Sequence, residues 1–106
     1  MQGSTATVGA VTTIKNSLDG IYVDSSGTAV VNGGFISGCT RGIWVYNSTC
    51  TINNVEVNGN TTGIDADSAS TLTMSAGKIV NNTTGLYVEG TGKATLAGSS
   101  GVYNGW

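Results

Sequence analysis

Apolar and polar residues alternate along this chain in short stretches, and the alternation recurs with a period of about 22 residues. Four successive segments each open with glycine followed by Ile or Leu, at spacings of 22, 21 and 22 residues. These segments are residues 20–41, 42–62, 63–84 and 85–106. Residues 4–19 match the later part of a preceding segment. The pattern predicts one repeat domain spanning residues 1–106, built from a partial coil and four full coils.

Each segment contains three stretches with the period-2 pattern of half-buried strands. In the first stretch the inward positions are Ile21/Val23, Ile43/Val45, Ile64/Ala66 and Leu86/Val88. In the second stretch they are Ala6/Val8, Ala29/Val31, Cys50/Ile52, Leu72/Met74 and Ala94/Leu96. The third stretch is marked by Ile14, Ile36, Val57, Ile79 and Val102. Without crossover helices these strands cannot form βαβ units. The pattern therefore predicts an all-β solenoid of about five coils of about 22 residues, with three short strands per coil.

The segment TLTMSAGKIVNNTTGLYVEG closely resembles the right-handed β-helix repeats of bacterial surface adhesins. Those repeats run as a Gly-Val-Tyr-Val strand, a Thr-rich strand and a Gly-x-Ile-x-x-Asn segment. The likeness extends from about residue 5 to residue 106 and implies a single right-handed parallel β-helix of the pectin-lyase-like type. Pectate lyases, polygalacturonases, phage tailspikes and autotransporter passengers share this fold. The resemblance therefore specifies an architecture and not an activity.

The composition narrows the function classes. Only 9% of the residues are charged, the formal net charge is −2, and there is no histidine. A chain with this charge has no basic surface patch that could bind nucleic acid. No apolar run approaches the ~18 residues that a membrane-spanning helix needs. Residues 1–10 lack the basic and apolar regions of a secretory signal. Since histidine is the commonest general base and transition-metal ligand, we expect a non-enzymatic protein with no cofactor and no metal.

The first strand of each coil presents two outward columns of aromatic and acidic residues. One column holds Tyr22, Trp44, Asp65 and Tyr87, and the next holds Asp24, Tyr46, Asp67 and Glu89. Aromatic faces beside carboxylates suit a sugar, because they stack on C–H faces and accept hydroxyl protons. The alternative is a ladder of rings that only stabilises the sheet. The predicted glycan-contact face comprises Tyr22, Trp44, Tyr46, Asp65, Asp67, Tyr87 and Glu89.

Two carboxylates of this face raise the question of chemistry. Asp65 and Asp67 are two residues apart on one strand, so both point outward about 7 Å apart. That separation fits an inverting glycosidase, and it also suits a calcium site with Asp24 or Glu89 as a further ligand. Coils of 21–22 residues leave no room for loops that wall a cleft, and nothing in the sequence raises one carboxyl pKa. We therefore expect neither catalysis nor a metal here.

The second strand carries outward threonines in Thr-x-Thr pairs. Two columns of Thr on a flat face resemble the ice-binding surfaces of some antifreeze solenoids, although Val30 and Lys93 interrupt the array. Threonine is also simply a favoured exposed strand residue. The predicted ice-binding face comprises Thr5, Thr7, Thr28, Thr49, Thr51, Thr71, Thr73 and Thr95.

One turn column contains Ser17, Cys39, Asn60 and Asn82. Because neighbouring coils are about 4.8 Å apart, the two Asn side chains could hydrogen-bond along the axis, although ordinary turn formation explains them equally well. Asn-x-Ser/Thr sequons predict N-glycosylation if a glycosylating organism secretes the chain, unless the side chain points inward. The sequons begin at Asn47, Asn60, Asn81 and Asn82.

The two cysteines occupy different phases of the repeat. Cys50 takes an inward slot, which suits a small buried hydrophobe. Cys39 belongs to the turn column, so a disulfide with Cys50 forms only if that turn folds inward. Two cysteines are too few for a metal site or a disulfide framework.

Neither terminus carries the amphipathic helix or polar turn that normally covers a solenoid. The chain starts where a first strand would have ended, and it stops where another would begin. Either this is a piece of a longer repeat protein or copies stack head to tail into a fibre. The predicted end-to-end contacts are Ala6, Val8, Val102, Tyr103 and Trp106.

The predicted function is a non-enzymatic extracellular or cell-surface structural protein. It would be a β-helix subunit of a self-assembling fibre or surface adhesin, with itself as partner and glycans as further partners. The alternatives are a carbohydrate-binding module of the tailspike or adhesin kind, an ice-binding protein, and a polysaccharide depolymerase fragment.

Overall fold

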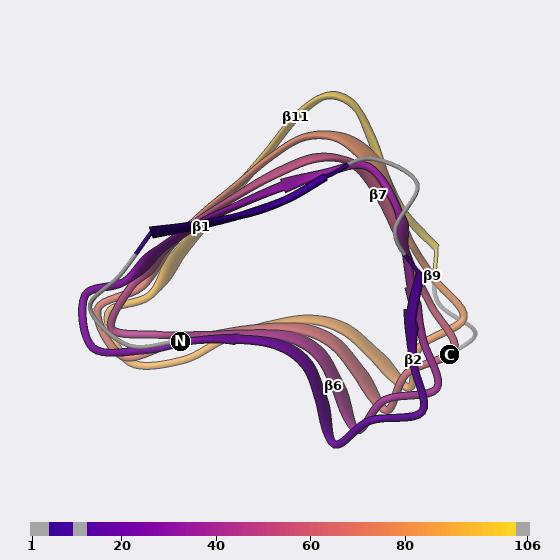
Figure 1. The fold of residues 1–106 in the computed structure, drawn as a ribbon, viewed down its shortest axis with the longest axis horizontal. Coiled ribbons are helices and arrows are strands. Elements are labelled where there is room, and N and C mark those ends of the chain that lie inside the picture. The colour runs from indigo at the N-terminus through magenta and orange to yellow at the C-terminus, as the bar shows by residue number, and fades with distance from the viewer. Residues whose placement is uncertain (1–4, 10–12, 104–106) are drawn as a thin grey trace.

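A computed structural model describes the backbone of residues 5–9 and 13–103 and the side chains up to residue 96 (Figure 1). The described residues form eleven strands and no helix. The strands are β1 (Thr5–Val8), β2 (Thr13–Lys15), β3 (Asp19–Val23), β4 (Thr28–Asn32), β5 (Phe35–Ser37), β6 (Arg41–Tyr46), β7 (Thr49–Asn58), β8 (Thr62–Asp67), β9 (Thr71–Val80), β10 (Thr84–Val88) and β11 (Lys93–Tyr103). Among these residues, no helix is long and apolar enough to cross a membrane.

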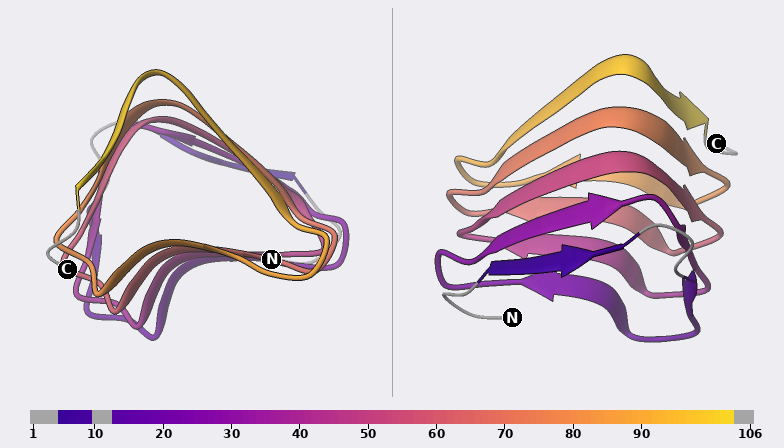
Figure 2. Two further views of the ribbon diagram at one scale, coloured as in Figure 1. Left: turned by 180° about the vertical axis from the view of Figure 1, so that it is seen from behind. Right: turned by 45° about the horizontal axis from the view of Figure 1, so that its top comes forward.

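All strand pairs are parallel and connect one coil to the next. A four-stranded sheet has the order β10-β8-β6-β3. A seven-stranded sheet has the order β1-β4-β7-β5-β2, with β9 beside β7 and β11 beside β9. The coils stack in chain order, as Figure 2 shows. The fold is a parallel β-solenoid of about four turns, so the predicted architecture is confirmed and the predicted coil count is close.

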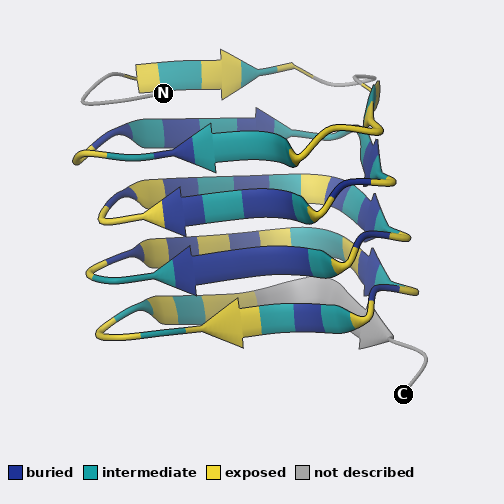
Figure 3. Cartoon of the chain, turned by 90° about the horizontal axis from the view of Figure 1, so that it is seen from below, coloured by how far each residue is buried: buried dark blue, intermediate teal, exposed yellow. Residues whose placement is uncertain are grey.

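The strand register confirms the inward columns that the sequence predicted. Ile43 pairs with Ile21 and Ile64, and Val31 pairs with Val8 and Ile52. The inward residues of the middle coils are completely buried, and the same positions recur from coil to coil in Figure 3. Each coil is too thin to bury its own apolar face, so the core forms only when coils stack.

The expectation of three short strands per coil holds only for the first coils. There the second and third sides are separate strands, but in β7, β9 and β11 they run together as one bent strand. The bend carries register shifts between Ile52 and Val55, and it places Asn54 at a φ of 61°. This bulge also turns Val55 inward, where it is a fully buried core residue that the repeat pattern did not predict.

The predicted amide ladder is confirmed. The side-chain amide of Asn60 donates to Asn82 Oδ1 at 3.0 Å, and the backbone N–H of Cys39 donates to Asn60 Oδ1 at 2.9 Å. Both Asn side chains are buried. Because both side chains are buried, the inward orientation that the sequence analysis named as excluding glycosylation applies to Asn60 and Asn82. Asn47 and Asn81 are exposed, and their glycosylation stays a prediction.

Both cysteines are buried and free. Cys50 occupies its inward slot, where burial raises the pKa of its thiol to about 12. The Cys39 thiol donates to the carbonyl of Ser37 at 3.4 Å. The predicted alternative of a disulfide between them is not what the structure contains.

Candidate functional site

The outer face of the four-stranded sheet collects the aromatic and acidic residues that the sequence placed in two columns. Strand pairing aligns Tyr22 with Trp44, Trp44 with Asp65, and Asp65 with Tyr87. In Figure 1 the outline of the coil bends inward along this sheet. We call this surface the aromatic–acidic face; it comprises Tyr22, Asp24, Trp44, Tyr46, Asp65, Asp67, Tyr87 and Glu89.

The N-terminal half of the aromatic–acidic face is a ladder of rings. Tyr22 and Trp44 stack with centroids 4.3 Å apart at 15°, and Tyr46 meets Trp44 edge-on at 6.1 Å. The Arg41 guanidinium carbon lies 3.6 Å from the centroid of the Trp44 ring. Ring stacking and the cation–π contact stabilise this part of the sheet. The alternative of a ladder of rings that stabilises the sheet therefore holds for Tyr22, Trp44 and Tyr46.

Arg41 borders the aromatic–acidic face through its contact with Trp44, and the sequence pattern did not identify it. It pairs in register with Asp19, and its Nε lies 2.6 Å from Asp19 Oδ1. Two opposite charges one repeat apart in the sequence were the signal that could have found it. Since Arg41 is bound to Asp19 and packed on Trp44, its charge is already largely engaged.

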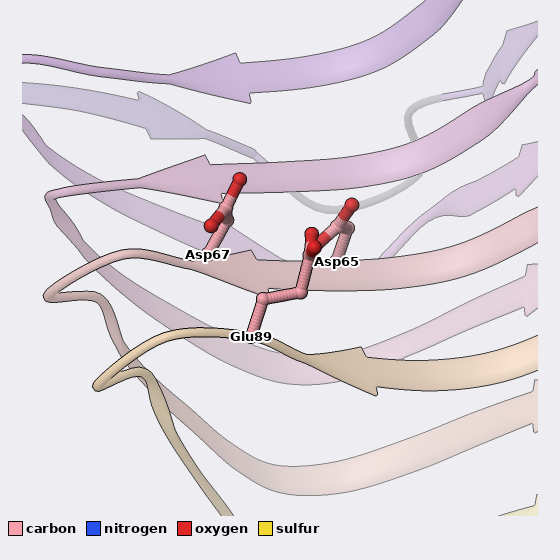
Figure 4. A group of neighbouring side chains, drawn as sticks. All are labelled: Asp65, Asp67 and Glu89. Carbon is pink, nitrogen blue, oxygen red and sulfur yellow. The ribbon is translucent and has the colours of Figure 1, made fainter.

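The C-terminal half of the aromatic–acidic face is an acidic cluster, shown in Figure 4. Asp65, Asp67 and Glu89 each bring one carboxylate oxygen to within 4.8 Å of the others. Strand β8 carries the two aspartates, and Glu89 follows β10. The sequence suggested Asp24 or Glu89 as the third carboxylate. The structure places Glu89 in the cluster, whereas Asp24 accepts a hydrogen bond from the Tyr22 hydroxyl at 2.9 Å.

Asp65 is the most unusual group of the cluster. It is only 7% exposed although it points to the outer face, and its Oδ1 atom has no hydrogen-bond partner. Burial raises the pKa of Asp65 to about 6, with further contributions from the Glu89 charge and a hydrogen bond with Glu89. The expectation that nothing here raises a carboxyl pKa was wrong, because the neighbouring coils bury the Asp65 carboxyl. This burial depends on contacts between coils, which the sequence alone does not show.

The indole of Trp44 provides a second unsatisfied polar atom beside Asp65. Its Nε1 is buried and has no hydrogen-bond partner. Trp44 and Asp65 pair directly across β6 and β8. The aromatic–acidic face thus holds one unpaired donor and one unpaired acceptor on adjacent rungs, and buried polar groups without partners are rare in native proteins. Tyr46 and Tyr87, which are 38% and 49% exposed, belong to the same two columns.

The threonine face is also in the predicted register. Thr49 aligns with Thr28 and Thr71, and Thr51 aligns with Val30 and Thr73. Val30 and Lys93 interrupt the two columns as the sequence indicated. Ice binding by Thr5, Thr7, Thr28, Thr49, Thr51, Thr71, Thr73 and Thr95 stays a prediction.

The predicted end contacts are only partly described. Ala6 and Val8 are half-buried at the N-terminal end. For Val102 and Tyr103 the structure gives the backbone pairing to β9, and Trp106 lies outside the described residues. Val88 and Leu96, inward residues of the C-terminal coil, are 42% and 38% exposed.

A hollow that the sequence did not predict lies at the bend of β7 and β9. Two of its lining residues are glycines, and no aromatic side chain lines it. Its lining residues are Gly34, Asn54, Val55, Glu56, Gly77 and Lys78.

Comparison with known protein families gives one match that covers nearly the whole chain. The family model described as periplasmic copper-binding protein (NosD) matches residues 2–106. No curated protein and no solved structure gives a significant match to the chain.

Proposed function

The chain belongs to the NosD family, a periplasmic family, and on that premise we propose that it is a periplasmic or extracellular β-solenoid that binds neutral glycans through its aromatic–acidic face. Binding without turnover is part of the proposal. The support comes from the residues of that face and not from the family description, which names copper and no glycan.

Copper does not fit the residues that the chain offers. Copper(I) favours thiolate and thioether ligands, and copper(II) favours imidazole. The sequence has no histidine. Cys39, Cys50 and Met74 are all buried, and the high pKa of the Cys50 thiol keeps it protonated. The described residues therefore supply no soft donor set at the surface, and we assign no copper chemistry to them.

One observation carries the glycan proposal: the exposed rings of Tyr46 and Tyr87 lie beside the carboxylates of Asp67 and Glu89. A sugar can pack its apolar C–H face on a ring while one of its hydroxyl groups donates to a carboxylate. Ligand sites typically combine aromatic walls with a few convergent polar groups. The carboxylates disfavour anionic polymers, so the proposed ligand is a neutral glycan.

The burial of Asp65 argues against turnover. A general acid must reach the glycosidic oxygen within hydrogen-bonding distance. The Asp65 Oδ1 atom is inaccessible to solvent, and bound sugar would have to displace neighbouring side chains to reach it. The raised pKa of Asp65 therefore reflects its burial and the nearby Glu89 charge. It does not by itself make Asp65 an acid catalyst.

Affinity electrophoresis tests the proposal. The chain is run in native gels containing dextran, laminarin or galactomannan, and Trp fluorescence is recorded in solution with the same polymers. We expect retardation by at least one polymer and about tenfold weaker binding in Tyr46→Ala and Tyr87→Ala, equivalent to the loss of about 1.4 kcal/mol. Thr73→Ala, on the threonine face, is the matched control. Reducing-sugar release is assayed in parallel.

Three outcomes would overturn the proposal. The first is mobility unchanged by every neutral polymer. The second is binding that Thr73→Ala weakens as much as Tyr87→Ala, since that would place the ligand elsewhere. The third is sugar release that disappears in Asp65→Asn, which would replace binding by the depolymerase alternative.

A second candidate function is end-to-end stacking into a fibre. Val88 and Leu96 belong to inward columns whose other members, such as Ala66 and Met74, are completely buried. A further coil stacked on the C-terminal one would bury both side chains, and a second copy of this chain can supply that coil. This candidate uses different residues from the glycan proposal, so the two are independent.

A further inference from the structure

We propose that Asp65, Asp67 and Glu89 form a binding site for a hard divalent cation of the size of Ca²⁺. The expectation from the sequence was that the chain holds no metal. The NosD description does not suggest this site either, because it names a softer metal with different ligand preferences. The inference concerns a different ligand from the glycan proposal, although both involve carboxylates of the aromatic–acidic face, and it is independent of stacking.

The first support is geometric. The three carboxylate oxygens lie within 4.8 Å of one another. Calcium binds oxygens at about 2.3–2.6 Å, so two ligands of one ion can be up to about 5 Å apart. Magnesium binds at about 2.1 Å and needs its ligands within about 4.2 Å of each other. Separations of up to 4.8 Å lie within the range that calcium accepts.

The second support is the unpaired oxygen of Asp65, which does not depend on the clustering. Asp65 is more than nine-tenths buried, and Oδ1 accepts no hydrogen bond. A buried carboxylate oxygen without a partner costs free energy. A cation bound by Asp65 would offset this cost, which no protein donor offsets at Oδ1.

The third support is the local charge. The cluster carries a formal charge of −3 when its three carboxyl groups are ionised. Arg41 is the only cation that lowers the pKa of Asp65, and its effect is smaller than the opposing effects of burial, Glu89 and Asp67. Arg41 is also held by Asp19 at 2.6 Å. The described residues therefore leave the cluster without a matching positive charge, which a divalent ion would supply.

The arrangement also leaves room for a complete coordination shell. Calcium takes about six to eight oxygens, part of them from water. Asp67 and Glu89 are half-exposed, so water reaches the outer side of the cluster. Three carboxylates plus water resemble the weaker calcium sites of extracellular modules, with dissociation constants of about 10⁻⁴–10⁻³ M.

Calorimetry on the chelator-treated chain tests the site, first with CaCl₂ and then with MgCl₂ at the same ionic strength and without any glycan. We expect one saturable calcium site in that millimolar to submillimolar range and clearly weaker magnesium binding. Asp67→Asn and Glu89→Gln should each weaken calcium binding about tenfold or more. Glu56→Gln removes a carboxylate far from the cluster and should leave it unchanged.

Terbium luminescence gives a second readout that does not depend on the stability of a variant. Bound Tb³⁺ near Trp44 and Tyr87 should be sensitised by excitation of those rings, and calcium should displace it. Absence of saturable calcium binding would overturn the inference. So would equal affinity for calcium in Glu89→Gln and Glu56→Gln, or equal affinity of the wild-type chain for calcium and magnesium.

Discussion

At the scale of single residues, Asp65 shows how a repeat converts an ordinary surface position into an unusual one. Its column otherwise holds Tyr22, Trp44 and Tyr87. A short carboxylate between large rings is shielded from water by its neighbours. Its burial therefore follows from the residues one coil away on each side, which the residues adjacent in sequence do not reveal.

The stability of the metal-free chain should fall as the pH rises through the titration range of Asp65. Burial and Glu89 raise the pKa of Asp65 from 3.8 to about 6, so the folded state holds the proton more tightly than the unfolded chain. Between about pH 4 and 6 the folded state therefore loses stability relative to the unfolded state. Asp65→Asn should increase the free energy of unfolding by about 1–2 kcal/mol at neutral pH, after allowance for solvent screening, and change it little at about pH 4.

Urea unfolding of both proteins at the two pH values, in chelator, checks this prediction. Glu89→Gln should reduce the pH dependence, because Glu89 supplies the second-largest contribution to the raised pKa. Equal effects of Asp65→Asn at the two pH values would contradict it.

At the scale of strands and turns, the bend within β7 and β9 demands a particular backbone. Gly77 has a φ of 125°, and a Cβ atom built there would lie 2.3 Å from the carbonyl oxygen of Val55. Both the left-handed conformation and the close approach of backbone require glycine. The sequence signal was a glycine at this place in the repeat, but the steric reason emerges only from the stacked coils.

Gly77→Ala should destabilise the chain by about 2–4 kcal/mol, since it combines backbone strain with a steric clash. Gly59→Asn is the control. Gly59 also has a positive φ, of 72°, but nothing lies within 4 Å of its added Cβ. Asn tolerates this conformation, so the control should change stability by less than about 1 kcal/mol. Thermal unfolding by circular dichroism compares the two, and similar losses would show that the Val55 contact is unimportant.

The repeat made the strands and their register predictable, because a period-2 pattern repeated every 22 residues leaves one consistent stacking. The joining of the second and third strands was not predictable, since it depends on the bulge near Asn54. Within the candidate site, the two columns followed from the same periodicity. The burial of Asp65, the choice of Glu89 over Asp24 and the engagement of Arg41 did not, because they depend on side-chain contacts between coils.

At the scale of the whole molecule, the solenoid carries different chemistry on different sides. The aromatic–acidic face lies on the four-stranded sheet, while the threonine columns lie on the seven-stranded sheet. A continuous apolar core separates them. A substitution on one face is therefore expected to have little effect on the other face. The free-energy changes caused by substitutions at distant sites of this kind are usually additive. This separation makes Thr73→Ala a fair control for Tyr87→Ala.

Stacking between copies, the second candidate function, belongs to the same scale and would bury the exposed side chains of Val88 and Leu96. Continuing the register past β11 would set Ala6 and Val8 of a second copy beside Ala94 and Leu96. Such a contact repeats without closing and gives a filament.

Leu96→Lys should abolish assembly, because it places a charge in the apolar junction. Thr95→Lys, its outward neighbour on β11, should preserve assembly. Electron microscopy and light scattering over a concentration series measure the outcome. Unbranched filaments with an axial repeat near five strand spacings, about 24 Å, are expected for the wild-type chain and for Thr95→Lys. A wild-type chain that stays monomeric at every concentration would contradict stacking. Glycan and calcium binding would be unaffected by that result, since both use side chains on the outer face of a single copy.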